Sequence, residues 1–345
     1  MSSQASSTPT YSTRRPASSR RLSRQVYVPV LAAVALFAAV VLAIGIGPVN
    51  VGPWTVVRAL AGAETGLAST IVNDIRLPRV LLGVMVGASM AMSGAILQGV
   101  TRNPLADPHI FGISAGAGVI AVAGTVLFPQ VPKETIQPLA FIGGLTGGGV
   151  AYAMAWRGGV TPARLALAGI AVTSMLTAVT SAILVTSAFS AQIGLRWLIG
   201  GLALRNWDDF WLLAPYFVFG TAVAFLMARQ LNVISLGDEV ATSLGQNVER
   251  TRLVLVGVAA LLASSAVSIA GLIGFVGLII PHFVRLILGN DYRLLLPTSA
   301  LFGAILLVLG DTAARTVFDP QELPVGVLTA VLGGPVFIML VRRRA

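Results

Sequence analysis

Val28-Pro-Val-Leu-Ala-Ala-Val-Ala-Leu-Phe-Ala-Ala-Val-Val-Leu-Ala-Ile-Gly-Ile46 is an uncharged apolar stretch of the length that crosses a lipid bilayer. A membrane-spanning helix takes about 20 mostly apolar residues. A basic, Ser-rich segment precedes this stretch, as in a secretory signal peptide. The run is longer than the core of a signal peptide and lacks a small-x-small cleavage site. We therefore predict that it is retained as the first transmembrane helix.

Further apolar runs follow along the chain, each bounded by charged residues, Pro or Gly. Together with the first run they predict an all-α, polytopic membrane protein with about ten transmembrane helices. The least distinct boundaries are the tight joins after Gln98 and Ile269. The expected helices cover Val28–Ile46, Val80–Val100, Phe111–Leu127, Pro138–Trp156, Leu165–Val185, Phe210–Ala228, Leu253–Ile269, Leu272–Leu288, Leu295–Ala314 and Val325–Val341.

The composition agrees with a lipid environment. Of the 345 residues, 56% are hydrophobic and 10% are charged, whereas a typical soluble domain has about 25% charged residues. Residues 1–27 are rich in Ser, Thr and Arg and predict a disordered cytoplasmic tail. Residues 28–345 are expected to form one transmembrane domain.

Several function classes are disfavoured by the residues present. The formal charge is +10, but the arginines flank apolar runs and do not form one basic face, so nucleic-acid binding is not expected. The chain has no Cys and only His109 and His282 as histidines, so we expect no resident metal site. It has no Gly-Lys pair and hence no phosphate-binding loop for ATP hydrolysis. We expect a non-catalytic chain that binds no cofactor.

The basic residues are distributed unevenly between the two sides of the predicted bundle. If both termini share a side, that side carries 16 Lys and Arg residues and the other side carries seven. Because basic residues concentrate in cytoplasmic loops, we predict that both termini are cytoplasmic. The side expected to face outward then holds Arg58, Arg76, Arg79, Lys133, Arg196, Arg205 and Arg315.

The longest cytoplasmic loop in this topology covers residues 229–252 and contains a predicted short helix. Asp238 and Glu239 would lie in its first turn and Gly245 at its end, as helix termini prefer. Residues four apart would form one apolar face, namely Leu236, Val240 and Leu244. An exposed face of this kind can bind a partner, or it can pack against the chain's own helix ends. The spacing leaves both interpretations open.

Five motifs follow one another between Arg76 and the C-terminus. They are Arg76-Leu-Pro-Arg79, Asn103-Pro-Leu-Ala-Asp-Pro108 with Gly112-Ile-Ser-Ala-Gly116, the loop from Leu236-Gly to Leu244-Gly245, Gly274-Phe-Val-Gly-Leu-Ile-Ile-Pro-His282 with Arg285, and Glu322-Leu-Pro-Val-Gly326. In this order they resemble the FecCD family, the permeases of bacterial importers for iron siderophores, haem and cobalamin.

The resemblance implies an ABC transporter permease in the bacterial cytoplasmic (inner) membrane that imports an iron-siderophore complex, haem or cobalamin. The implied partners are a dimer of ATP-binding subunits, which would hold ATP and magnesium, a second permease copy or sister permease, and an external substrate-binding lipoprotein. Transport would proceed by alternating access at the interface of two permeases. The alternative is a secondary transporter driven by an ion gradient, although we find no charge pair in the middle of the predicted spans.

The resemblance also assigns roles to residues at the two ends of the bundle. The loop 229–252 would couple to the ATPase through Leu236, Gly237, Asp238, Glu239, Val240, Leu244 and Gly245. Arg76, Arg79 and Arg315 would dock carboxylates of the binding protein, which arginine can bind through two hydrogen bonds. In the alternative interpretation, Arg76 and Arg79 mark the headgroup boundary, and Arg315 pairs with Asp311 one turn earlier.

Two further sets of residues match the pathway of the family. Asn103 and Leu105 match positions of the cytoplasmic gate, whereas Pro162-Ala163 stands where the family has a pair of small hydroxyl residues. A stripe of hydroxyl groups lies on the helix that lines the family's pathway, formed by Thr173, Thr177 and Ser181. Alternatively, these hydroxyl groups bond to their own backbone or hold helices together.

Overall fold

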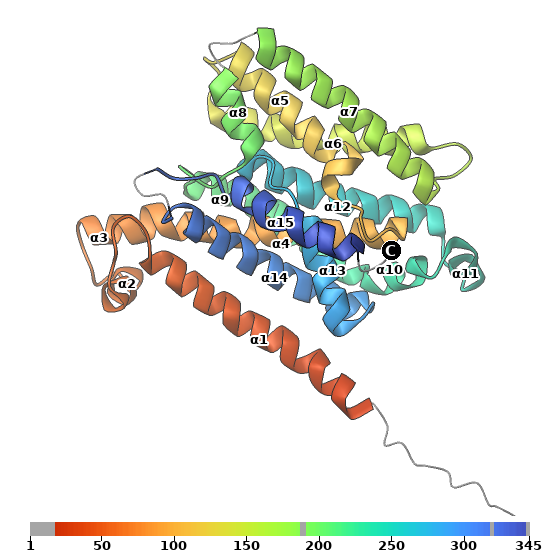
Figure 1. The fold of residues 1–345 in the computed structure, drawn as a ribbon, viewed down its shortest axis with the longest axis horizontal. Coiled ribbons are helices and arrows are strands. Elements are labelled where there is room, and N and C mark those ends of the chain that lie inside the picture. The colour runs from red at the N-terminus through yellow and green to blue at the C-terminus, as the bar shows by residue number, and fades with distance from the viewer. Residues whose placement is uncertain (1–17, 187–190, 318–320, 343–345) are drawn as a thin grey trace, which may run out of the picture.

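The computed structural model describes residues 18–186, 191–317 and 321–342. Within these residues the chain is helical and contains no strand. Every helix expected from an apolar run is present (Figure 1). The helices are α1 (Ser18–Gly45), α4 (Leu77–Thr101), α5 (Ile113–Leu127), α6 (Lys133–Ala155), α7 (Pro162–Thr186), α9 (Trp207–Leu226), α12 (Val248–Ala270), α13 (Val276–Leu288), α14 (Tyr292–Ala314) and α15 (Val325–Arg342).

The helices differ in length. In the described part of the chain, seven are long and apolar enough to cross a membrane: α1, α4 with the turns before it, α6, α7, α9, α12 and α14. Three shorter apolar helices, α5, α13 and α15, complete the expected set. Two of them start late because irregular backbone precedes them: the 3-10 turn η2 (Pro108–Phe111) before α5, and residues 271–275 before α13.

Short elements that hydropathy did not predict occupy the connections. They are α2 (Pro53–Leu60), α3 (Leu67–Ser69), η1 (Thr70–Arg76), which leads directly into α4, α8 (Ala191–Ile199) and α10 (Ala228–Ser235). The expected short helix in the loop 229–252 is α11 (Asp238–Ser243). Both α10 and α11 lie at the end of the bundle from which α1 starts and toward which α15 runs (Figure 1).

The first helix begins earlier than expected. In the structure α1 starts at Ser18, so residues 18–27, which were predicted to belong to the tail, are helical. Arg and Gln in this stretch are good helix formers and extend the helix beyond its apolar part. Residues 1–17 lie outside the described residues.

The centre of the bundle is formed by α4 and α12, whose most apolar stretches are 89% and 78% buried within the chain. The corresponding values are 22% for α1 and 17% for α7, and both helices lie at the outer edges of the bundle (Figure 1). Close contact in the centre depends on glycine. A Cβ atom on Gly94 of α4 would lie 2.0 Å from the carbonyl oxygen of Gly277 in α13. Small residues allow such close approach of helices in a membrane.

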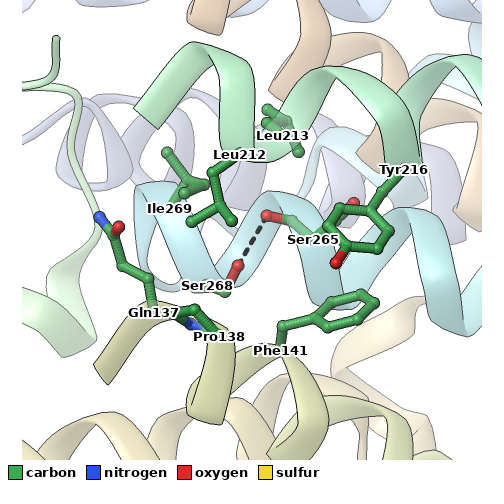
Figure 2. A pocket seen from close by; sticks show the side chains of 9 residues that line it. All are labelled: Gln137, Pro138, Phe141, Leu212, Leu213, Tyr216, Ser265, Ser268 and Ile269. Atoms are coloured by element: carbon green, nitrogen blue, oxygen red, sulfur yellow. Dashed lines mark hydrogen bonds between the residues drawn. The ribbon is translucent and has the colours of Figure 1, made fainter. Parts of the chain in front are cut away.

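One small cavity lies between α6, α9 and α12 (Figure 2). Its volume is about 20 Å³, which is room for about one water molecule. Ser268 Oγ donates a hydrogen bond to the carbonyl oxygen of Ser265 beside it. At the edge of the cavity, Gln137 Nε2 donates to Asp209 Oδ1 at 2.6 Å. This cavity is much too small to hold a large ligand, for which pockets measure about 300–1,000 Å³.

Candidate functional site

The predicted site residues gather at two opposite ends of the bundle. The arginine cluster, defined as Arg76, Arg79 and Arg315, lies where α4 begins and α14 ends. The α11 segment, residues 236–245, lies at the other end, beside α10 and α12 (Figure 1). At one end charged side chains are buried, and at the other end apolar side chains are exposed.

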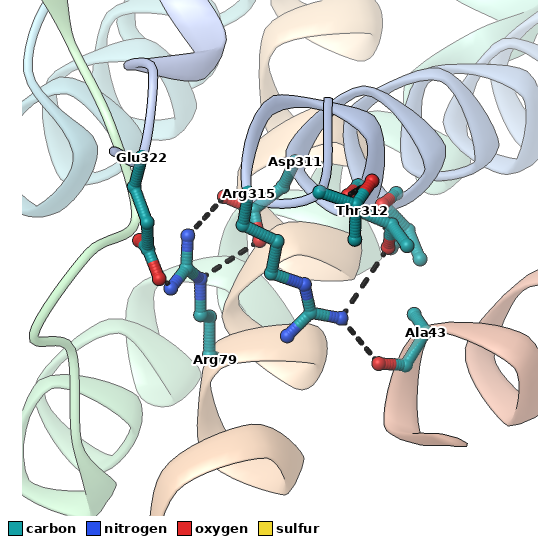
Figure 3. A network of polar contacts seen from close by, with 8 residues as sticks. Ala43, Arg79, Asp311, Thr312, Arg315 and Glu322 are labelled. Atoms are coloured by element: carbon teal, nitrogen blue, oxygen red, sulfur yellow. Dashed lines mark hydrogen bonds and ion pairs between the residues drawn. The ribbon is translucent and has the colours of Figure 1, made fainter. Parts of the chain in front are cut away.

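Arg79 joins α4 to α14 and to the segment before α15 (Figure 3). Its Nε and Nη2 donate to the two carboxylate oxygens of Asp311 at 2.8 and 3.0 Å. Its Nη1 donates to Glu322 Oε2 at 2.9 Å. Paired hydrogen bonds between a guanidinium and a carboxylate are among the strong polar contacts in proteins. The Asp311 side chain is 6% exposed and that of Glu322 is 36% exposed, so Glu322 is the accessible member of this network.

Arg315 and Arg76 bind the carbonyl end of α1. Arg315 Nη2 donates to the carbonyl oxygen of Ala43 (Figure 3), and Arg76 Nη1 donates to those of Ile44 and Gly45 at 2.8 and 2.9 Å. The last carbonyl groups of a helix lack partners within the helix and carry partial negative charge. Two cations therefore cap the C-terminus of α1.

The three arginines predicted to dock a binding protein at the outer surface have buried guanidinium groups in this structure. Arg76, Arg79 and Arg315 are 4%, 7% and 3% exposed. The alternative pairing of Arg315 with Asp311 is replaced by the Arg79–Asp311 pair, because Asp311 lies against α4 whereas Arg315 lies against α1. Docking of a binding protein at this end stays a prediction.

A large cavity borders this end of the bundle. It has a volume of about 840 Å³ and is lined by Arg79 and Glu322 together with α8 and the segment that follows it. Arg196 and Trp197 of α8 line it, as does Arg205. Burial lowers the pKa of the Arg205 guanidinium below its ordinary value, and the nearby Asp209 carboxylate opposes this shift. Glu322, which belongs to a quoted motif, received no role from the sequence because its partner Arg79 is distant along the chain.

The α11 segment exposes apolar side chains. Leu236, Val240 and Leu244 are 64%, 44% and 64% exposed, while Ala241 on another face of the helix is fully buried. The alternative that the stripe packs against the chain's own helix ends is therefore not realised in this structure. Glu239 is exposed, and Asp238 forms an ion pair with Arg252 at 2.8 Å.

Glycines flank this short helix. Gly237 has a φ angle of 121° and Gly245 one of 78°. Residues with a side chain rarely adopt such positive values, so each glycine permits a sharp change of chain direction. The segment is thus a short helix between two backbone bends, as the sequence indicated for Gly245.

The predicted gate residues lie in the loop between α4 and η2. Asn103 and Leu105 are exposed, and the Asn103 side-chain oxygen accepts a hydrogen bond from the Leu105 backbone N–H at 3.0 Å. This local turn fixes the two residues relative to each other. Their predicted role at a gate remains a prediction.

The three residues of the hydroxyl stripe on α7 have different contacts. Thr173 Oγ1 accepts from the Gly112 N–H at 3.0 Å and donates to the His109 carbonyl oxygen at 3.2 Å, so it ties α7 to the start of α5. Ser181 Oγ donates to the carbonyl oxygen of Thr177 in its own helix at 3.0 Å. The side chain of Thr177 is exposed. Two of the three hydroxyl groups thus have the structural contacts of the alternative interpretation, and pathway lining stays a prediction.

Comparison with known proteins connects this geometry to transport. The sequence profile of the FecCD transport family matches residues 35–343. The Fe(3+)-citrate import system permease protein YfmD of Bacillus subtilis is 44% identical over 79% of this chain and 81% of its own length. The cobalamin import system permease protein BtuC of Halobacterium salinarum is 49% identical over 80% of this chain and 74% of its own.

Two further comparisons extend the coverage. The hemin transport system permease protein HmuU of Yersinia pestis is 42% identical over 84% of this chain and 93% of its own length. A solved structure of an ABC transporter assigned to the metal-chelate type, in an inward-facing conformation, has a TM-score of 0.83 at 27% identity. It covers 92% of this chain and 99% of its own.

Proposed function

The chain belongs to the FecCD transport family, and from this premise we propose that it is the permease through which an ATP-driven importer carries an iron-siderophore complex across the cytoplasmic membrane. It is an ABC transporter permease with many membrane-spanning helices. Haem and cobalamin are the other candidate cargoes, because relatives carry these names together with Fe(3+)-citrate. An iron chelate is our first choice because iron-import permeases recur among the relatives.

The observation that carries the proposal is the exposed apolar stripe on α11. A soluble protein rarely leaves large apolar side chains together in water unless they bind a partner. Leu236 and Leu244 are each 64% exposed. They lie at the end of the bundle where α1 begins and toward which α15 runs (Figure 1). We propose that this end is cytoplasmic and that the stripe docks on an ATP-binding subunit. ATP and magnesium would be held by that partner, and no cofactor by this chain.

The proposed route for the cargo lies between two permease copies or between this chain and a sister permease. The cavity between α6, α9 and α12 has a volume of only about 20 Å³. In contrast, α7 exposes large apolar side chains on the outside of the bundle, including Ile170 at 50% and Met175 at 69%. Pairing across this helix would create an interface that can open alternately to either side.

The binding protein would dock at the opposite end, beside the cavity of about 840 Å³. Of the three predicted docking arginines, Arg79 is the one that borders this cavity and bonds to a partly exposed acid. Arg76 and Arg315 are bound to α1 carbonyl groups. An incoming carboxylate would thus meet Arg79 by displacing Glu322, while Asp311 keeps its paired hydrogen bonds.

Co-purification from the native membrane in mild detergent tests the proposal. An ATP-binding subunit should co-purify with the wild-type chain and be lost when Leu236, Val240 and Leu244 are all changed to Asp. The matched control is Thr242→Asp, an exposed residue on another face of the same helix, which should retain the ATPase. Unchanged elution in size-exclusion chromatography shows that each variant is folded.

The competing function has a different outcome. If no ATPase co-purifies with the wild-type chain even after crosslinking, and uptake by proteoliposomes follows an ion gradient, the chain is a secondary transporter. The same result would remove the proposed coupling role of α11.

A further inference from the structure

The Asp238 carboxylate connects α11 to two other parts of the chain. Its Oδ1 accepts from Nη2 of Arg252 at 2.8 Å and from Nη2 of Arg102 at 3.4 Å. Arg252 belongs to the first turns of α12, and Arg102 directly follows the last residue of α4. One acid in the first turn of α11 thus binds two cations from different helices.

The Arg252 side of this arrangement extends to the segment before α7. Arg252 is 1% exposed, and its Nη1 donates to the Val160 carbonyl oxygen. Glu249, one turn earlier in α12, accepts from the Val160 N–H at 3.1 Å. The start of α12 therefore holds both backbone polar groups of Val160. The residue before Val160 is Gly159, whose φ angle of 119° is one that residues with a side chain rarely adopt.

The Arg102 side leads to the loop that carries Asn103 and Leu105. Arg102 adopts a φ angle of 52° at the end of α4, so the chain turns sharply into this loop. Glycine at position 237 leaves room for the contact, since a Cβ there would lie 3.3 Å from Arg102 Nη1. A displacement of α11 would pull on Arg102 and hence on the loop that starts at the next residue.

We propose that Asp238 is a positioning residue that transmits movement of α11 to the loop at 103–105 and, through Arg252, to the segment before α7. This inference rests on the proposed function, in which a partner ATPase moves α11. It assigns the stripe and the acid different tasks on the same short helix. The stripe binds the partner, and the acid conveys the partner's movement to the permease.

A thiol reporter in the loop tests the inference. The chain contains no cysteine, and Leu105 is 42% exposed, so Leu105→Cys introduces one reactive site into the permease. The full complex with its co-purified ATPase is placed in nanodiscs, and the rate of maleimide labelling is measured with and without ATP and magnesium. In this parent we expect ATP to change the rate by about fivefold or more, the lower range of typical coupling between sites.

Two variants remove the link, and a third serves as control. Arg102→Gln should retain the ATPase and its hydrolysis of ATP but reduce the ATP-dependent change in labelling to less than about twofold. Asp238→Asn should reduce the ATP-dependent change to the same extent in complexes that still contain the ATPase. Combining the two substitutions should reduce the ATP-dependent change in labelling little further, because both remove the contact between Arg102 and Asp238. Arg250→Gln removes a nearby exposed cation that forms no ion pair among the described residues, and it should behave as the parent.

The outcomes separate this inference from the proposed function. If both variants show the full ATP-dependent change while the ATPase remains bound, the relay through Asp238 is wrong and the proposed function stands. If the parent itself binds no ATPase, both fail. Should Asp238→Asn not elute as a folded complex, Arg102→Gln decides, because the Arg102 side chain is 39% exposed and its removal does not open the core.

Discussion

The two ends of the bundle offer opposite surfaces to a partner. In the arginine cluster, charged groups that the sequence placed on the surface are buried and bonded within the chain. In the α11 segment, apolar groups that an ordinary fold would bury are exposed. A partner of the α11 segment would therefore bind without rearrangement, whereas a partner of the arginine cluster would have to replace contacts within the chain by contacts to itself. The same family resemblance predicted a docking surface at both ends, and only the structure distinguishes them.

The largest expected effect comes from breaking the buried pair at the arginine end. Arg79→Ala leaves the Asp311 carboxylate buried without its cation, which costs about 3–5 kcal/mol of stability. The free energy of unfolding in detergent, measured by denaturant titration, should fall by that amount. Arg58→Ala is the control, because Arg58 is exposed and its partner Glu64 is only partly buried, so loss of this pair should cost less than about 1 kcal/mol. Equal losses for the two variants would contradict the contrast between buried and exposed charges.

Removing a cap from α1 should have a smaller effect. Arg315→Ala leaves a buried carbonyl group at the end of α1 without its donor, at a cost of about 1–3 kcal/mol. Thermal unfolding followed by tryptophan fluorescence should show the loss, and Arg196→Ala, which removes an exposed arginine at the same end, should not. An unchanged melting temperature for Arg315→Ala would show that the hydrogen bond from Arg315 to α1 does not contribute to stability.

Backbone strain beside α11 should weaken the binding of the ATPase. Gly245→Ala places a side chain at a φ angle of 78° without a steric clash, so the expected cost is about 1 kcal/mol. If α11 unwinds to relieve it, the affinity for the ATPase falls about fivefold. Gly149→Ala is the matched control, because this helical glycine also has open space around its Cβ position and an ordinary φ angle. Titration of labelled ATPase into permease nanodiscs measures the difference.

The smallest effect concerns pH at the α11 end. Hydrogen bonds from Arg293, together with those from Asn232, lower the pKa of Asp291 from 3.8 to about 2. Because the folded-state pKa is lowered, the stabilisation is present above pH 3.8 and disappears as the pH falls toward 2. Asp291→Asn should therefore lower the melting temperature at about pH 5 and make little difference at about pH 2. A pH-independent difference would contradict this assignment.

Hydropathy predicted the spans because burial in lipid acts on each helix separately. The ten apolar runs became the ten apolar helices, and periodicity within one short loop predicted the apolar stripe of α11. Whether this stripe is exposed was left open by the spacing, and in the structure it is exposed. The partners of the arginines were not predictable in this way. Arg79 and Asp311 are 232 positions apart, and the i to i+4 spacing of Asp311 and Arg315 favoured a local pair. Which carboxylate an arginine meets depends on how α1, α4 and α14 pack together.

The contacts of Arg252 were likewise not predictable from the sequence pattern. A charged residue near the start of an apolar run was assigned to a cytoplasmic loop, where it counted only toward the topology. In the structure its side chain is 1% exposed and contacts both Asp238 and Val160. Glu249 and Gly159 complete that arrangement. No periodic pattern marks residues that meet only after three segments have come together.

The capping of α1 by Arg315 has a consequence for the order of assembly. Helix α1 packs mainly against α14, and its carbonyl end bonds to an arginine 272 positions later in the chain. During synthesis α1 must therefore remain in the membrane without its main neighbour until nearly the whole chain has been inserted. Arg76, which follows α1 closely, supplies the early cap on Ile44 and Gly45. Biogenesis thus closes the bundle by joining its first helix to one of its last.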